Sequence, residues 1–206
     1  MASRDGVLRK RRAARFGRAG IAIALALGIL GAYLPGGPME TTRKILQSSN
    51  KIVTGPGTRE QKLEQLKGLL RDFLDTDALG RQSMGKHLDG TTPEQQKRFF
   101  ELFRDLFVRT YVQRLLLFDA PDFAYGKETV TGDTARIGTE IVTPNDRFAV
   151  DYALQKKPSG WQATDILIED VSLAANFRSQ FDQALAKSSF DELLGKLDRK
   201  LHGKKD

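Results

Sequence analysis

The spacing of apolar residues divides the chain into a helical first half, a stretch of strands and a helical end. Over residues 45–53, 63–73, 78–84 and 93–117 the apolar residues recur at the spacing of one helix face. Between residues 123 and 168 the period falls to two, which is typical of half-buried strands. A helical period returns after residue 172. The pattern predicts an α+β domain of four helices, four strands and two further helices.

Three of the predicted helices begin with a capping box. In this motif the side chains of the N-cap residue and of the residue three positions later each accept a hydrogen bond from the other's backbone N–H. The three pairs are Thr58 with Gln61, Thr92 with Gln95, and Ser189 with Glu192. Glycine and proline at 55–57, and Gly85, predict where the first and third helices end.

The helix that begins at Thr92 has the widest apolar face in the chain. Its main row repeats every four positions, and three more residues widen it: Phe99, Phe103, Phe107, Tyr111 and Leu115, then Phe100, Leu102 and Leu106. This is more apolar surface than one flat neighbour requires. The pattern is typical of ordinary core as well as of a ligand pocket, so the row alone does not choose between them.

The strands are predicted to form antiparallel hairpins, with turns at 144–146 and 157–160. In the third strand the apolar residues alternate cleanly: Phe148, Val150, Tyr152 and Leu154. In the fourth strand Trp161 has the opposite parity from Ile166 and Ile168. A bulge, or burial of both faces, is therefore expected there.

Residues 160–181, GWQATDILIEDVSLAANFRSQF, lead from a strand into a helix whose apolar residues recur every four positions. Three carboxylates, those of Asp165, Glu169 and Asp170, lie close to that junction. Acidic residues favour helix N-termini, so we interpret the cluster as helix entry and solvation rather than as an acid/base site.

Most of the net charge of +7 belongs to the N-terminus. Residues 1–18 hold seven basic side chains and one acidic one, so the rest of the chain carries only +1. Residues 21–34 contain no charged residue and are followed by Pro-Gly-Gly-Pro. This arrangement predicts a secretory signal over residues 1–38 and one exported domain over 39–206. An uncleaved N-terminal anchor is the alternative, although spanning a bilayer takes about 20 apolar residues.

The residue inventory excludes several kinds of chemistry. The chain has no cysteine, and its two histidines, His87 and His202, lie far apart, so no paired-histidine metal site is expected at helical spacing. The sequence also lacks a phosphate-binding loop and a nucleophile elbow. We therefore expect no catalytic residue, no metal and no cofactor, and the charge distribution argues against a nucleic-acid partner.

Two segments resemble the MlaC or Ttg2D family of Gram-negative periplasms, also called toluene-tolerance proteins. Residues 92–107, TPEQQKRFFELFRDLF, with Tyr111, are similar to the central helix of that family. The second signature of the family matches at Trp161, Asp165, Val171, Ser172, Leu173, Asn176, Arg178, Gln180 and Phe181. The chain departs from the usual pattern where Thr164 replaces an aromatic residue, Asp170 a glycine, Phe177 a tyrosine, and Ser188 with Ser189 a glycine.

The resemblance implies helices packed on a four-stranded antiparallel curved sheet, an NTF2-like cone, with an apolar cavity between them. It also implies a monomeric periplasmic carrier whose cargo is a phospholipid or another diacyl lipid. The implied partners are an outer-membrane lipoprotein/porin complex and an inner-membrane ABC transporter complex with its substrate-binding subunit, and the implied role is to maintain outer-membrane lipid asymmetry.

Three alternatives stay open. The first is a hopanoid-associated lipid carrier, since some relatives are associated with hopanoid lipids. A non-lipid-binding periplasmic adaptor would have the same surface as solid core, and an enzyme would need an acid or base inside the pocket. If the protein is a carrier, the expected tail contacts come from the central helix, the sheet and the helix after it: Phe103, Phe107, Tyr111, Val150, Tyr152, Ile166, Ile168, Leu173 and Phe177.

Overall fold

The computed structural model describes residues 36–117 and 122–203. Its elements follow the predicted order: α1 (Pro38–Thr54), α2 (Arg59–Phe73), α3 (Thr76–Met84), the short 3₁₀ helix η1 (Gly85–Leu88), α4 (Pro93–Leu115), β1 (Asp122–Thr131), β2 (Thr134–Val142), β3 (Arg147–Lys157), β4 (Gly160–Ile168), β5 (Val171–Ser172), α5 (Leu173–Leu185) and α6 (Phe190–His202). The signal or anchor expected over residues 1–38 falls almost entirely outside the described residues. None of the described helices is long and apolar enough to span a bilayer.

All three predicted capping boxes are present, at the starts of α2, α4 and α6. Each start is fixed by two hydrogen bonds between residues three positions apart, so it depends on local sequence alone. The C-terminal ends agree less closely, since α4 ends at Leu115 rather than at Leu117.

The sheet has five strands in the order β1-β2-β3-β4-β5, and all neighbouring pairs are antiparallel. The prediction of four strands is therefore wrong. The additional strand, β5, has only two residues, too few to produce an alternating pattern. It pairs with β4 through a two-residue turn in which Glu169 and Asp170 have φ angles of 49° and 61°. Positive φ at both positions is the geometry of a type I′ hairpin turn, which favours glycine or asparagine.

Of the two alternatives expected for β4, a bulge or burial of both faces, the structure contains the bulge. Ala153 of β3 pairs with Asp165, whereas its neighbour Leu154 pairs with Ala163, so Thr164 is the extra residue. The extra residue reverses the parity of the strand. Trp161 and Ala163 before the bulge, and the two isoleucines after it, all therefore pack on the same core.

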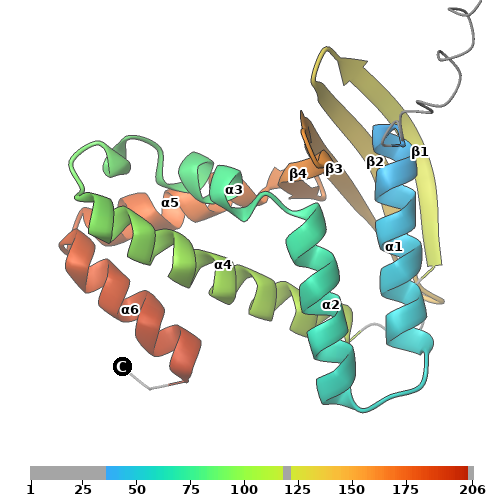
Figure 1. Cartoon of the computed structure of the whole chain (residues 1–206), viewed down its shortest axis with the longest axis horizontal. Coiled ribbons are helices and arrows are strands. Elements are labelled where there is room, and N and C mark those ends of the chain that lie inside the picture. The colour runs from blue at the N-terminus through green and yellow to red at the C-terminus, as the bar shows by residue number, and fades with distance from the viewer. Residues whose placement is uncertain (1–35, 118–121, 204–206) are drawn as a thin grey trace, which may run out of the picture. The chain divides into compact units, whose positions relative to one another are not determined.

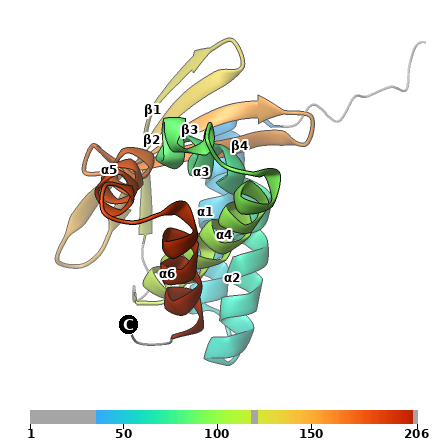
Figure 2. The same ribbon diagram turned by 90° about the vertical axis from the view of Figure 1, so that its left-hand side faces the viewer.

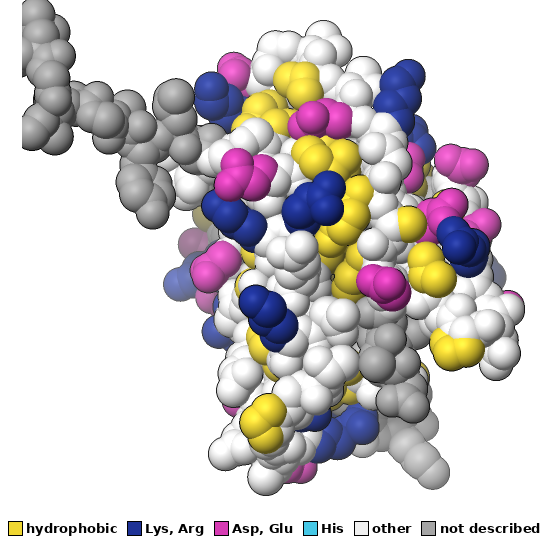
Figure 3. Space-filling view, turned by 90° about the vertical axis from the view of Figure 1, so that its right-hand side faces the viewer, with side chains coloured by type: hydrophobic (Ala, Val, Ile, Leu, Met, Phe, Trp, Pro, Cys, Tyr) yellow, Lys and Arg dark blue, Asp and Glu magenta, His cyan; other side chains and the backbone are white. Residues whose placement is uncertain are grey.

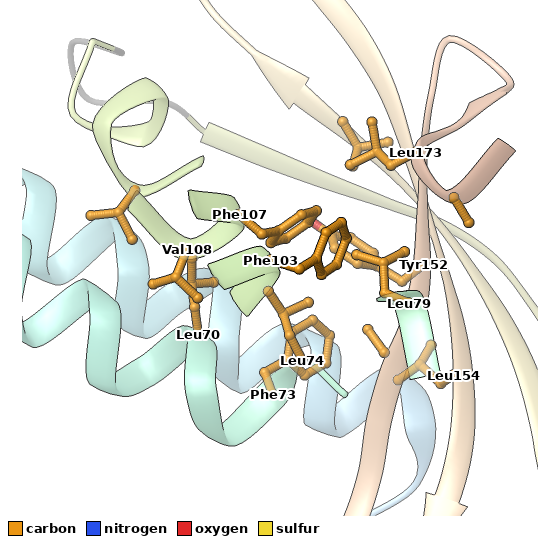
Figure 4. Packing of buried hydrophobic residues seen from close by; sticks show 14 of the residues in the cluster. Leu70, Phe73, Leu74, Leu79, Phe103, Phe107, Val108, Tyr152, Leu154 and Leu173 are labelled. Atoms are coloured by element: carbon orange, nitrogen blue, oxygen red, sulfur yellow. The ribbon is translucent and has the colours of Figure 1, made fainter. Parts of the chain in front are cut away.

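The helices form two groups around the sheet (Figures 1 and 2). Helix α1 contacts β1 and β2, and α2 contacts β4, so these helices cover one face of the sheet. Helix α3 packs on α4 and α5, and α6 packs on α4, beyond one end of the sheet. The long helix α4 contacts both groups. Figure 4 shows its Phe103 and Phe107 projecting toward Tyr152 of β3.

The polar residues of the second signature hold this framework together. One carboxylate oxygen of Asp165 accepts from the N–H of Ala174 at 3.1 Å, and the other accepts from the hydroxyl of Ser172 at 2.5 Å. Asp165 thereby helps to cap the start of α5, as expected for a helix-entry residue. On the same helix, the guanidinium of Arg178 donates to the carbonyl of Gln82 at 2.9 Å and ties α5 to α3.

Candidate functional site

Two hollows adjoin helix α4, one between α4 and the sheet and one between α4 and the helices α5 and α6. The first, which we call the sheet chamber, has a volume of about 380 Å³ and lies between α1, α2, α4 and the inner face of the sheet. Its walls are formed by Ile45, Leu46, Ser49, Leu70, Phe73, Leu74, Phe107, Tyr111, Arg114, Leu115, Leu117, Ile141, Phe148, Val150, Tyr152, Ile166 and Ile168.

The polar side chains of the sheet chamber are few, and two of them, Ser49 and Tyr152, have hydrogen-bond partners. The hydroxyl of Ser49 donates to the carbonyl of Leu46 at 2.7 Å, so it is not left unpaired. Burial raises the pKa of the Tyr152 hydroxyl far above its usual value, and a hydrogen bond with Thr139 opposes this only in part. Tyr152 is therefore neutral at physiological pH. A wall of this composition favours hydrocarbon over water.

The second hollow, the helix chamber, has a volume of about 420 Å³ and lies between α4, α5, α6 and the β4–β5 hairpin. It is more polar than the sheet chamber. Its walls are formed by Phe103, Leu106, Phe107, Thr110, Tyr111, Arg114, Ile168, Val171, Leu173, Asn176, Phe177, Gln180, Phe181, Leu197 and Lys200. Four residues, namely Phe107, Tyr111, Arg114 and Ile168, line both chambers and so form the partition between them.

Both chambers reach the surface. Leu117, which lines the sheet chamber, is 75% exposed, and Val171, which lines the helix chamber, is 55% exposed. Large apolar side chains that are this exposed are uncommon elsewhere in the described part of the chain, where Val130 is the further example. Each volume lies within the range of about 300–1,000 Å³ that is usual for small-molecule sites.

The nine residues expected to contact cargo all line one chamber or both. Phe107, Tyr111, Val150, Tyr152, Ile166 and Ile168 line the sheet chamber. Phe103, Leu173 and Phe177 line the helix chamber only. The structure thus brings the nine together around two hollows instead of one. Whether they touch a ligand stays a prediction.

Sequence reasoning did not single out many of the wall residues, and two groups of them are instructive. The first comprises the apolar residues of α1 and α2, whose spacing looks like that of any surface helix. The second is Arg114, which stands three positions after Tyr111 and so shares its helix face. The spacing of Arg114 from the aromatic row was therefore a usable signal.

The structure offers little for acid/base chemistry at the chambers. Within residues 36–117 and 122–203, no histidine, aspartate or glutamate lines either hollow. The imidazole Nε2 of His87 lies 2.6 Å from a carboxylate oxygen of Asp182, but this pair joins η1 to α5 and belongs to neither wall. In the same part of the chain no group of three potential ligand side chains is placed to hold a metal ion.

One face of the molecule can be judged for charge in Figure 3. Lysine and arginine side chains are interspersed there with aspartate and glutamate, and hydrophobic side chains lie between them. A nucleic-acid surface would instead gather basic side chains into a continuous patch.

Comparison with known proteins agrees with the resemblance seen in the sequence. The family model described as MlaC protein matches residues 39–199, which run from α1 into α6. The toluene tolerance protein ttg2D of Pseudomonas putida is 24% identical over 150 residues, which cover 68% of this chain. The matched region spans 64% of the length of ttg2D, just under two thirds.

A second relative is the intermembrane phospholipid transport system binding protein MlaC of Haemophilus influenzae. It is 22% identical over 176 residues, covering 78% of this chain and 82% of that protein. Among solved structures, the phospholipid-binding protein of Ralstonia solanacearum, determined in complex with a phospholipid, is 22% identical and superposes with a TM-score of 0.74 over 82% of this chain and 99% of that one. At this identity the likeness establishes a common fold. Since the family model covers most of the chain, the protein belongs to the MlaC family.

Proposed function

We propose that the protein is a periplasmic phospholipid carrier that moves its cargo between outer-membrane and inner-membrane complexes and so maintains outer-membrane lipid asymmetry. The observation that carries the proposal is the pair of adjoining chambers, one with a largely apolar wall and one with a wall of mixed polarity, neither of which contains an acidic side chain among the described residues. Support also comes from the relatives, one of which is named for intermembrane phospholipid transport and another of which was solved with a phospholipid bound.

The energetics of lipid transfer explain why a carrier needs such chambers. A diacyl lipid has roughly 30 methylenes, and moving each from hydrocarbon to water costs about 0.8 kcal/mol, so unaided transfer costs on the order of 25 kcal/mol. A carrier removes this barrier by surrounding the tails with apolar side chains. The head group can stay in water, which places it at the chamber openings.

The proposed tail contacts divide between the chambers. The largely apolar sheet chamber takes hydrocarbon against Phe107, Tyr111, Val150, Tyr152, Ile166 and Ile168. The helix chamber extends this surface with Phe103, Leu173 and Phe177. The volumes of about 380 Å³ and 420 Å³ make both chambers available to a cargo with two tails.

The proposal also covers export and exchange. Residues 1–38 act as a signal or as an anchor that places the domain in the periplasm. The monomeric carrier exchanges cargo with an outer-membrane lipoprotein/porin complex and with the substrate-binding subunit of an inner-membrane ABC transporter complex. No acid or base at the chambers is required for this, and the protein acts as a binding protein rather than an enzyme.

Organic extraction of the purified full-length protein, followed by mass spectrometry, tests the proposal. Stoichiometric phospholipid is the expected result. Recovery of hopanoids would favour the hopanoid-associated carrier, and protein free of lipid would favour an adaptor. Turnover of a small substrate would favour an enzyme. A second assay measures transfer of labelled phospholipid between two vesicle populations, and the protein should accelerate it.

A further inference from the structure

Arg114 occupies a particular place in the wall. It lies on α4 beside Tyr111 and lines both chambers. Its guanidinium carbon lies 5.4 Å from the centroid of the Tyr111 ring, which holds the cation in place through a cation–π contact. The side chain of Arg114 is nevertheless exposed. It therefore stands where the apolar hollows meet water, which is where the polar end of a lipid with buried tails must lie.

The other arginines of α4 have acceptors among the described residues, whereas Arg114 has none there. Arg98 pairs with Asp198, Arg104 with Asp77 at 2.8 Å, and Arg109 donates to the carbonyl of Leu201. For Arg114, no hydrogen bond or ion pair to any described residue is found. Within the described residues its N–H groups are therefore without an acceptor, on a side chain that is exposed.

The charges around Arg114 favour an anion. Counting only described residues, the charged side chains in the two walls are Arg114 and Lys200, both cations. A guanidinium presents a planar fork of N–H donors that binds a phosphate through two parallel hydrogen bonds. The ligand chemistry that fits this place is a phosphate ester attached to hydrocarbon.

We propose that Arg114 binds the phosphate of the cargo and so makes the protein selective for phospholipids over uncharged lipids with the same tails. This inference rests on the proposed carrier function and names the residue that determines head-group selectivity at its site. The apolar walls bind the tails of either lipid, and Arg114 supplies the difference between them. Lys200 lines only the helix chamber and is not part of the partition.

The test compares two probes that differ only in the head group. Delipidated full-length protein is titrated with dioctanoylphosphatidylglycerol and with dioctanoylglycerol. Wild type should prefer the phospholipid. Arg114→Gln should lose about ten- to a hundredfold in phospholipid affinity, the effect of one charge-assisted pair of hydrogen bonds, while its affinity for dioctanoylglycerol is unchanged. Arg114→Lys keeps the charge but loses the fork, so it should fall between the two.

Arg43→Gln provides the matched control. The guanidinium of Arg43 also lies over an aromatic ring, 3.9 Å from the centroid of Tyr125, but Arg43 lines neither chamber. It should bind both probes as wild type does. If Arg114→Gln keeps the wild-type preference for the phospholipid, the role of Arg114 is refuted and the carrier function stands. If wild type binds neither probe, the carrier function itself falls.

Inorganic phosphate distinguishes a lipid head group from a free anion. Without tails to anchor it, inorganic phosphate alone should give no saturable binding to the delipidated protein. Saturable binding that Arg114→Gln abolishes would indicate a free-phosphate site and overturn the assignment to the lipid phosphate. Thermal unfolding of each variant checks that the exposed substitution leaves the fold intact.

Discussion

Placing a carboxylate on the partition between the chambers should block lipid uptake in a pH-dependent way. Ile168 is the position of choice because it lines both chambers and pairs across the strands with Val150. In Ile168→Glu without cargo, the new carboxylate faces a hollow that reaches solvent and stays hydrated. When a tail enters, the carboxylate loses that water and must either pay the desolvation cost or take up a proton.

The size of the effect follows from the shift in the pKa of the new carboxyl. A carboxyl pressed against hydrocarbon has its pKa raised by about two to three units, and each unit corresponds to about 1.4 kcal/mol. Ile168→Glu should therefore bind phospholipid about 3–4 kcal/mol more weakly at neutral pH, a loss of roughly a hundred- to a thousandfold. The bound form carries the raised pKa, so affinity should recover as the pH falls from about 7 toward about 5.

The assay is titration of delipidated protein with a phospholipid that carries a fluorescent label on one tail, repeated across that pH range. Ile168→Gln, which is polar but does not titrate, should bind with the same affinity at each pH. Val130→Glu places the same carboxylate at an exposed position on β1 that lines neither chamber, and it should bind as wild type does. A folded Ile168→Glu protein with wild-type affinity at neutral pH would refute the placement of tails against the partition.

Two further predictions concern stability. Asp170→Gly should raise the free energy of unfolding by about 0.5–1 kcal/mol, because Asp170 adopts a left-handed φ of 61° that glycine adopts without strain. The same change at Asp89, whose φ is −62°, should lower that free energy by a similar amount, and denaturant titration of both variants decides the point. Because burial raises the pKa of Tyr152, its hydroxyl stays protonated in the folded state at pH values at which it ionises in the unfolded state. The free energy of unfolding of wild type should therefore fall as the pH rises past about 10. Tyr152→Phe lacks this contribution, and unfolding curves of the two proteins that respond to alkaline pH alike would contradict the buried placement of Tyr152.

The parts of the fold that could be predicted from sequence are those fixed by neighbouring residues. A capping box spans three positions, and the bulge in β4 could be predicted because Trp161 and Ile166 differ in parity within a single strand. The strand β5 and the helix η1 were missed because each is too short for its pattern of apolar residues to repeat. Asp170 illustrates the same limit, since its positive φ follows from a hairpin whose second strand left no pattern.

The candidate site could be predicted in part. The aromatic row of α4 and the apolar residues of the sheet were identified because they form the largest apolar faces of the helices and of the strands, and two such faces are expected to pack together. The division into two chambers was not, because it depends on where α1, α2 and α6 pack, and no local pattern specifies that. Arg114 was overlooked for a different reason. Its spacing from Tyr111 was a usable signal, but exposed arginines are common on helices, and only the two hollows beside Arg114 make it a candidate.

The row of aromatic residues along α4 explains why periodicity alone cannot distinguish core from cavity. Phe99 is fully buried, and its ring contacts those of Phe103, at 5.5 Å between centroids, and Phe181, at 5.7 Å. Two turns further on, Phe107 and Tyr111 continue the same repeat but line the chambers. The row is therefore surrounded by side chains at Phe99, whereas from Phe103 onward it also borders open volume. Because solid packing around Phe99 anchors α4, the rest of the row can border empty space without loss of the fold. The hollow lowers the stability of the cargo-free protein by the van der Waals contacts that are absent there, and a bound tail restores these contacts.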